Sequence, residues 1–172
     1  MALATLTTAR LRVRALAPDD APFIVTLLND PSFIRNIGDR GVRTEEDALE
    51  YLVAGPLASY ARHGFGLCAV ALAASGEAIG ICGLLQRDEL PSPDLGFALL
   101  PRFWSQGYAF EAASAVMADA RARLGLATVL AIANPANAAS IRLLERLGFT
   151  DTGSTRLWNE TQDLTLFSWT AA

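Results

Sequence analysis

Residues Thr128–Ala133, with the sequence TVLAIA, place the strongest constraint on how this chain folds. An apolar strand that lacks polar alternation is typical of a central position in a sheet, buried on both faces. Helical patterns precede and follow it, at residues 107–124 and 137–147. The first carries a stripe of mostly small apolar side chains, which lets a helix pack closely against a sheet. The sequence therefore predicts an α/β fold with this strand inside the sheet.

Four more strands are expected before this central one. Alternation with period two predicts a strand at 11–16. Two apolar runs, 66–73 and 78–85, flank a glycine-containing turn and predict a hairpin. Pro101 ends a further strand at 94–100, because proline cannot donate a hydrogen bond to the ladder. The sequence thus places a run of strands before the long helix at 107–124.

The two ends of the chain complete this pattern. Near the N-terminus, helices are expected after Pro18 and after Thr44, and the intervening residues 32–43 are expected to form an irregular loop. The tail, 150–170, carries two strand-like pieces around a polar turn at Asn159 and Glu160. The length of 172 residues suits a single domain spanning 1–172.

Composition excludes several classes of protein. The formal net charge of −4 argues against a broad nucleic-acid surface, which needs clustered basic residues. No apolar run has the length of a membrane span, and the N-terminus lacks the pattern of a signal peptide, so a soluble cytoplasmic protein is expected. One histidine, His63, leaves little material for a metal site or a Ser-His-Asp triad, and no metal is expected. Cys68 and Cys82 lie in apolar stretches and are interpreted as buried free thiols.

A strand, a loop and a helix start follow one another between residues 94 and 111. The first N–H groups of a helix have no partner within it, and the helix dipole adds positive potential there, so such a start can bind an anion. Gly107 would let the backbone approach a phosphate without a Cβ in the way. The alternative is an ordinary tight turn between strand and helix, and these residues alone favour neither.

A second motif makes it possible to interpret the first one. Residues 134–149 read NPANAASIRLLERLGF, and residues 94–112 read DLGFALLPRFWSQGYAFEA. With Asn29-Asp30-Pro31 and the glycines at 80 and 83, these segments resemble the GCN5-related N-acetyltransferases, the GNAT superfamily. They are most similar to its branch of RimJ/RimL-type ribosomal-protein N-terminal acetyltransferases. The resemblance covers residues 8–170.

The resemblance implies a fold and a co-substrate. The family has a mixed, mostly antiparallel sheet of six or seven strands with about four helices, splayed into a V between the fourth and fifth strands. Those strands would be 94–100 and Thr128–Ala133, and acetyl-CoA would lie between them. Its pantetheine would pair with the backbone of Phe97, Ala98 and Leu99. Its pyrophosphate would bind the backbone N–H groups of Trp104, Ser105, Gln106, Gly107, Tyr108 and Ala109. The superfamily loop often carries a glycine and a basic residue where Ser105 and Gln106 stand, so no side chain of this loop supplies a cation.

Individual side chains then receive expected roles, each with an alternative. Asn137 would reach the cofactor with its amide or only cap a helix. Ser140 would protonate the departing CoA thiolate or only pack. Asp94 would accept the amine proton through water, anchor the substrate ammonium, or be an exposed carboxylate at a strand start. Glu111 is interpreted as an acid that complements the helix dipole, and His63 as a surface residue.

The acceptor is expected to enter between two loops. Aromatic and charged residues there would select the acceptor or merely reflect surface composition; they are Phe33, Arg35, Arg40, Trp158, Asn159 and Glu160.

The sequence therefore predicts an N-acetyltransferase in which an amine attacks acetyl-CoA directly in a ternary complex. Backbone N–H at Ala98 or Leu99 would stabilise the oxyanion. The acceptor would be a protein N-terminal α-amine or a small amine, and a homodimer is left open. The alternative is a non-catalytic module of the same fold that binds acyl-CoA.

Overall fold

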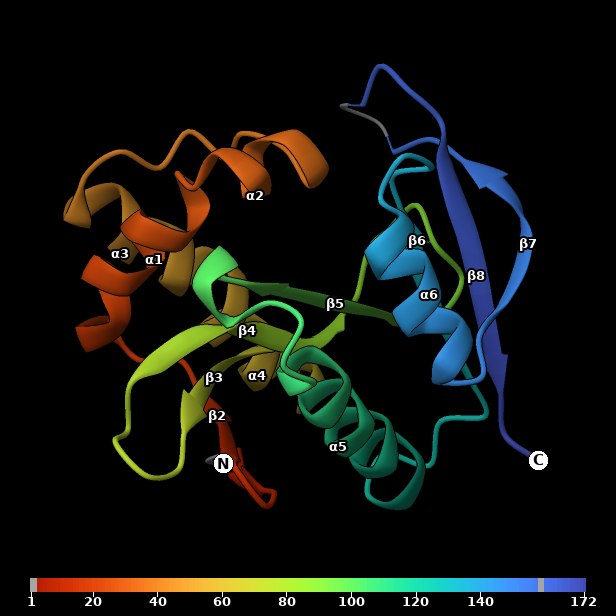
Figure 1. Ribbon diagram of the computed structural model, residues 1–172, viewed down its shortest axis with the longest axis horizontal. Coiled ribbons are helices and arrows are strands. Elements are labelled where there is room, and N and C mark those ends of the chain that lie inside the picture. The colour runs from red at the N-terminus through yellow and green to blue at the C-terminus, as the bar shows by residue number, and fades with distance from the viewer. Residues whose placement is uncertain (1–2, 158–159) are drawn as a thin grey trace.

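One twisted sheet organises the computed structural model, which describes residues 3–157 and 160–172 (Figure 1). Within these residues it has eight strands in the order β1-β2-β3-β4-β5-β6-β8-β7. The strands are β1 (Leu6–Thr7), β2 (Leu11–Ala15), β3 (Leu67–Leu72), β4 (Ala78–Leu85), β5 (Asp94–Leu99), β6 (Thr128–Ala133), β7 (Thr150–Thr155) and β8 (Leu164–Thr170). Neighbouring strands are antiparallel except β5 and β6, which run parallel.

Helices cover both faces of this sheet. They are α1 (Ala21–Leu28), α2 (Pro31–Asn36), α3 (Glu45–Leu52), α4 (Ala58–His63), α5 (Tyr108–Ala122) and α6 (Ala138–Arg146). The side chains of β3 alternate between two apolar clusters: Val70 packs with α5, and Ala69 packs with α1 and α3. Central strands therefore face apolar neighbours on both sides, which explains their continuous apolar sequences.

The predicted mixed, mostly antiparallel sheet is confirmed, but the numbers of strands and helices are larger than expected. The additional strand β1 has two residues and pairs with β2 through Leu6 and Thr7. Two residues are too few to produce a periodic pattern, so the sequence gives no signal for this strand.

Helix α2 corrects the prediction that residues 32–43 form an irregular loop. The Asp30 side chain accepts a hydrogen bond from the Ser32 N–H at 2.9 Å, and Pro31 occupies the first helical position. Both are signals for the start of a helix. The sequence Asn29-Asp30-Pro31 thus ends α1 and also begins α2, whereas only the ending was predicted.

The sheet opens into a V between β5 and β6, as the resemblance implied. Their register has one pair, Asp94 with Leu130, and the Leu130 N–H donates to the Pro93 carbonyl at 2.9 Å. Beyond this point the two strands diverge, and β6, β7, β8 and α6 form a separate wing (Figure 1). The edge of β5 that would carry a neighbouring strand is therefore left facing a gap.

Candidate active site

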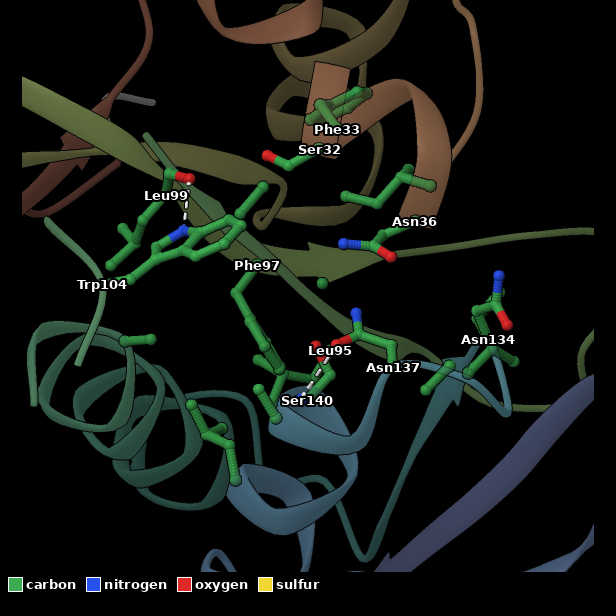
Figure 2. A pocket seen from close by; sticks show the side chains of 18 of the residues that line it. Ser32, Phe33, Asn36, Leu95, Phe97, Leu99, Trp104, Asn134, Asn137 and Ser140 are labelled. Carbon is green, nitrogen blue, oxygen red and sulfur yellow. Dashed lines mark hydrogen bonds between the residues drawn. The ribbon is translucent and has the colours of Figure 1, made fainter. Parts of the chain in front are cut away.

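A cleft of about 750 Å³ occupies this V. Its walls are β5 and the start of α5 on one side, the end of β6 and α6 on the other, and α2 across one end. Figure 2 shows Ser32, Phe33 and Asn36 of α2 on one side of the cleft and Asn137 and Ser140 of α6 on the other. A continuous hollow thus connects elements that lie far apart in the sequence.

The cleft brings together most of the residues predicted to bind a cofactor or to catalyse. Its lining includes Asp94, Phe97, Ala98, Leu99, Trp104, Ser105, Gly107, Tyr108, Ala109, Asn137 and Ser140. Gln106 is not part of the lining: its side-chain Nε2 donates to the Arg102 carbonyl at 3.0 Å.

The backbone of β5 presents alternate residues to the open edge. The Leu100 N–H donates to the Ile79 carbonyl at 2.9 Å, which marks a hydrogen-bonded pair with the start of β4. Because such pairs alternate along antiparallel strands, Ala98 bonds toward β4, and Phe97 and Leu99 direct their N–H and C=O groups toward the cleft. The Leu99 carbonyl accepts a hydrogen bond from the Trp104 indole Nε1 at 2.9 Å (Figure 2). The open edge thus leads directly into the loop that follows.

That loop turns sharply into the 15-residue helix α5. Gly107 is the N-cap and has φ of +83°, a left-handed conformation that favours glycine. Ser105 also has a positive φ, +59°, which is uncommon for a residue with a side chain. Gly107, Tyr108 and Ala109 line the cleft, so the start of α5 lies beside the space in which the predicted anion would bind.

A cation approaches this loop from the other end of the chain, which sequence reasoning missed. The Arg10 guanidinium donates from Nη1 to the Gln106 carbonyl at 2.9 Å and from Nε to Glu111 Oε2 at 2.7 Å. It also lies over the Tyr108 ring, 4.2 Å from its centroid. Thr8 Oγ1 donates to the same Glu111 carboxylate at 2.6 Å. The turn between β1 and β2 thus holds the loop and the start of α5 in place.

Glu111 consequently does more than complement the helix dipole. Partial burial acts to raise its pKa, but hydrogen bonds from Thr8 and Arg10 outweigh that effect and hold the pKa below its usual value. The carboxylate is therefore ionised at neutral pH and fixes Arg10 beside the loop. No local sequence pattern connects residues 10 and 111; their pairing depends on the fold.

Helix α6 supplies the opposite wall of the cleft. Asn137 is its N-cap, and the Asn137 side-chain oxygen accepts a hydrogen bond from the Ser140 N–H at 3.3 Å. The capping role of Asn137 is therefore present. Both side chains also line the cleft. The roles expected for them at the cofactor are therefore compatible with the capping of α6.

Asp94 corrects one expectation, since it is not an exposed carboxylate. Asp94 is 1% exposed. The Arg87 Nε lies 3.0 Å from Oδ1 and 3.2 Å from Oδ2 of the Asp94 carboxylate. Burial raises the pKa of Asp94, and the charge and hydrogen bonds of Arg87 oppose that rise. Asp94 and Arg87 form a buried ion pair at the point where β5 meets β6.

The other predicted residues are placed as follows. Phe33, Arg35, Arg40 and Glu160 line the cleft near α2, whereas Trp158 and Asn159 lie outside the described residues. His63 ends α4, is exposed, and stacks on Phe65 with ring centroids 5.5 Å apart. Cys68 and Cys82 are buried free thiols, and burial raises the pKa of Cys68 to about 11.

Two features are absent from the part of the chain that the structure describes. No helix there is both long and apolar enough to cross a membrane. No group of three or more histidine, cysteine or acidic residues lies close enough together to hold a metal ion in residues 3–157 and 160–172.

Solved structures share this arrangement. An acetyltransferase from Agrobacterium tumefaciens str. C58 is 27% identical with a TM-score of 0.84, over 99% of this chain and 96% of that one. A structure of RimL, the ribosomal L7/L12 alpha-N-protein acetyltransferase, in complex with coenzyme A has a TM-score of 0.81 over 97% of this chain and 98% of that one. It is 16% identical, so this second likeness concerns the fold.

Sequence comparison agrees with the structural likeness. The chain is 29% identical over 154 residues to FsC-acetyl coenzyme A-N(2)-transacetylase of Aspergillus fumigatus, which is 85% of this chain and 65% of that protein. A family model described as an acetyltransferase (GNAT) domain matches residues 10–150. That match covers most of the sequence, including β5, the loop before α5, and α6. The chain therefore belongs to the GNAT acetyltransferase family.

Proposed function

We propose that this acetyltransferase moves the acetyl group of acetyl-CoA to the α-amine of a peptide N-terminus, or to a small amine of similar basicity, as a RimJ/RimL-type enzyme. One observation carries the proposal: a single cleft runs along the open edge of β5, from a mouth beside α2 to the N-terminus of α5. The amine would enter at one end of this cleft, and the phosphates of the co-substrate would bind at the other. The fold likeness to RimL supports the choice of an α-amine.

The cofactor would lie along the open edge of β5. Phe97 directs its backbone N–H and C=O toward the cleft, so it would pair with the amides of pantetheine, and Ala98 and Leu99 would contribute by lining the cleft. The pyrophosphate would bind at the N-terminus of α5, over residues 104–109. Arg142 and Arg146 of α6 also line the cleft and would add the positive charge that the loop lacks. Asn137 would donate its amide to the cofactor while it caps α6.

Three groups would then serve the reaction. The amine nitrogen forms a bond with the acetyl carbon, and the carbon–sulfur bond breaks as the thiolate leaves. The Leu99 N–H, which points into the cleft, would stabilise the oxyanion between these events. Asp94 would accept the amine proton through several waters, because its own oxygens are buried and Leu99 lies at the other end of β5. Ser140 would protonate the thiolate from the opposite wall.

The proton balance favours an α-amine over a lysine. A peptide α-amine has a reference pKa of about 7.7–8.0, against about 10.4 for lysine. The unprotonated amine is the form that attacks, so an α-amine needs less help near neutral pH. A buried carboxylate that already pairs with Arg87 offers limited help.

Two matched peptides test the acceptor. One has a free N-terminus and no lysine, and the other has a blocked N-terminus and one lysine in the same sequence. We expect release of free CoA thiol with the first peptide and at least about tenfold less with the second, since their amine pKa values differ by more than two. Faster reaction of the blocked lysine peptide would overturn the α-amine proposal. Binding of acetyl-CoA without turnover of peptides or small amines would instead indicate the non-catalytic module.

Replacing Ser140 by alanine tests the proposed proton donor. We expect kcat to fall about a hundredfold or more, the lower end of the range for loss of a general acid, with little change in the KM for acetyl-CoA. The backbone N–H that bonds Asn137 remains in this variant, so the helix cap and the melting temperature should be kept. An unchanged kcat would assign Ser140 to packing alone.

A further inference from the structure

The acceptor end of the cleft is rich in arginine. Arg35 belongs to the last turn of α2, Arg40 follows in the connection to α3, and Arg87 lies between β4 and β5; all three line the cleft. The whole chain, by contrast, has a formal net charge of −4. Three arginines thus line this end of the cleft, although the chain as a whole is acidic.

The acids nearby do not cancel this charge. Three acidic residues line the cleft: Asp30, Asp94 and Glu160. Asp30 accepts hydrogen bonds from the Ser32 N–H and hydroxyl as the cap of α2, and Asp94 is buried. Among the described residues, neither Arg35 nor Arg40 has a carboxylate within salt-bridge distance. Asp94 pairs with Arg87, and Glu160, between β7 and β8, is the remaining acid of the lining.

Arg87 is held so that part of its guanidinium is available. Its Nε bonds Asp94, whereas Nη1 and Nη2 bond no other side chain within residues 3–157 and 160–172. A guanidinium has five N–H donors in a fixed fork, so a second anion can bind the remaining edge. Burial raises the pKa of Tyr51, and the charges of Arg40 and Arg87 both oppose that rise, so both arginines lie close enough to act on this tyrosine.

We propose that Arg35, Arg40 and Arg87 form a subsite for a carboxylate on the acceptor, close to the amine that is acetylated. This inference rests on the proposed function, since it names the acceptor of that site. The carboxylate would come from the side chain of an acidic residue next to a peptide N-terminus, or from the end of a very short acceptor. The same positive charges disfavour the ammonium form of the bound amine, which is the form that cannot attack.

The test uses two pairs of acceptors that differ in one charge. The peptides Ser-Asp-Ala-Ala and Ser-Asn-Ala-Ala, both with an amidated C-terminus, vary the second side chain. The dipeptide Ser-Ala with a free or an amidated C-terminus varies the terminal carboxylate. Each is titrated calorimetrically into the CoA-saturated protein, and each is also assayed for turnover. Binding is measured without catalysis, so failure of the proposed function, seen as no turnover, is separated from failure of the subsite.

We expect the acidic member of at least one pair to bind about tenfold more tightly, a ratio that one charge-assisted hydrogen bond supports. The pair that shows the preference identifies the source of the carboxylate. Arg40→Ala should reduce the ratio toward one, and Arg40→Glu should reverse it. Arg121→Ala, an exposed arginine at the far end of α5, is the matched control and should keep the ratio. Equal binding within both pairs by the unaltered protein, or a ratio that survives Arg40→Glu, would overturn the proposal.

Discussion

Replacing Gly107 by glutamate is expected to weaken CoA binding by about a hundredfold or more. Three effects combine. The residue has φ of +83°, where a side chain costs about 1–2 kcal/mol. A carboxylate placed beside the pyrophosphate adds like-charge repulsion of about 4 kcal/mol at 4 Å and intermediate dielectric. A Cβ at this position would also lie 3.2 Å from Arg10 Nη2, so the guanidinium that holds the loop must move. Calorimetric titration of CoA measures the loss.

Gly76→Glu is the control for this variant. Gly76 also has a positive φ, +77°, and its added Cβ would meet no atom within 4 Å in the turn between β3 and β4. It carries the same strain and the same charge away from the cleft. We expect its CoA affinity to match the unaltered protein, with a similar loss of stability to that of Gly107→Glu. Full CoA affinity in a folded Gly107→Glu protein would place the pyrophosphate elsewhere.

Breaking the buried pair of Asp94 and Arg87 is expected to have the largest effect on stability. Removing one partner from a buried ion pair costs about 3–5 kcal/mol, because the other charge is left without compensation. Arg87 is 24% exposed, so the lower figure applies to Asp94→Ala. For a chain of this length, about 3 kcal/mol lowers the melting temperature by about 6–12 °C. Thermal unfolding followed by circular dichroism measures this shift.

The partner variant, Arg87→Ala, should add a characteristic pH dependence. Asp94 would remain buried without its cation, so its pKa in the folded protein would rise further above the unfolded value of about 3.9. A raised pKa means that the stability is fully present below pH 4 and is lost as the pH rises through the folded pKa. The deficit of Arg87→Ala should thus be small near pH 4 and largest at neutral pH. The double variant Asp94→Ala/Arg87→Ala should lack this trend and be more stable than Arg87→Ala at pH 7; equal deficits at both pH values would contradict the assigned pairing.

Local patterns predicted the elements whose signals lie within a few residues. The apolar sequence of β6 and the Asn137 cap of α6 each depend on adjacent positions, and both are present. Helix α2 was missed although its signal is also local, because Asp30-Pro31 was interpreted as an ending and not as a cap followed by a first helical residue. The sequence contained that information.

Contacts between distant segments could not be predicted in this way. Arg10 and Glu111 are 101 positions apart, and neither residue has a pattern that requires the other. The burial of Asp94 depends on β6 and on the loop that carries Arg87, so a carboxylate at the start of a strand gave no sign of it. The V between β5 and β6 was expected only from the family resemblance. The hydrophobic periodicity of a strand does not show whether the neighbouring strand diverges from it.

Within the described residues, β5 and β6 share a single register pair, which joins the two wings at one point of the sheet. Beyond it the wings are joined by side-chain packing, in which Val129 and Leu144 share a core with α5. Such packing is non-directional, so small rotations of the C-terminal wing change the opening of the V without breaking main-chain hydrogen bonds. A molecule that paired with β5 and touched α6 would take the place of a missing strand, and part of its binding energy would set the angle between the wings. Substitutions in that shared core, which is remote from the cleft, would therefore change the affinity for the ligand.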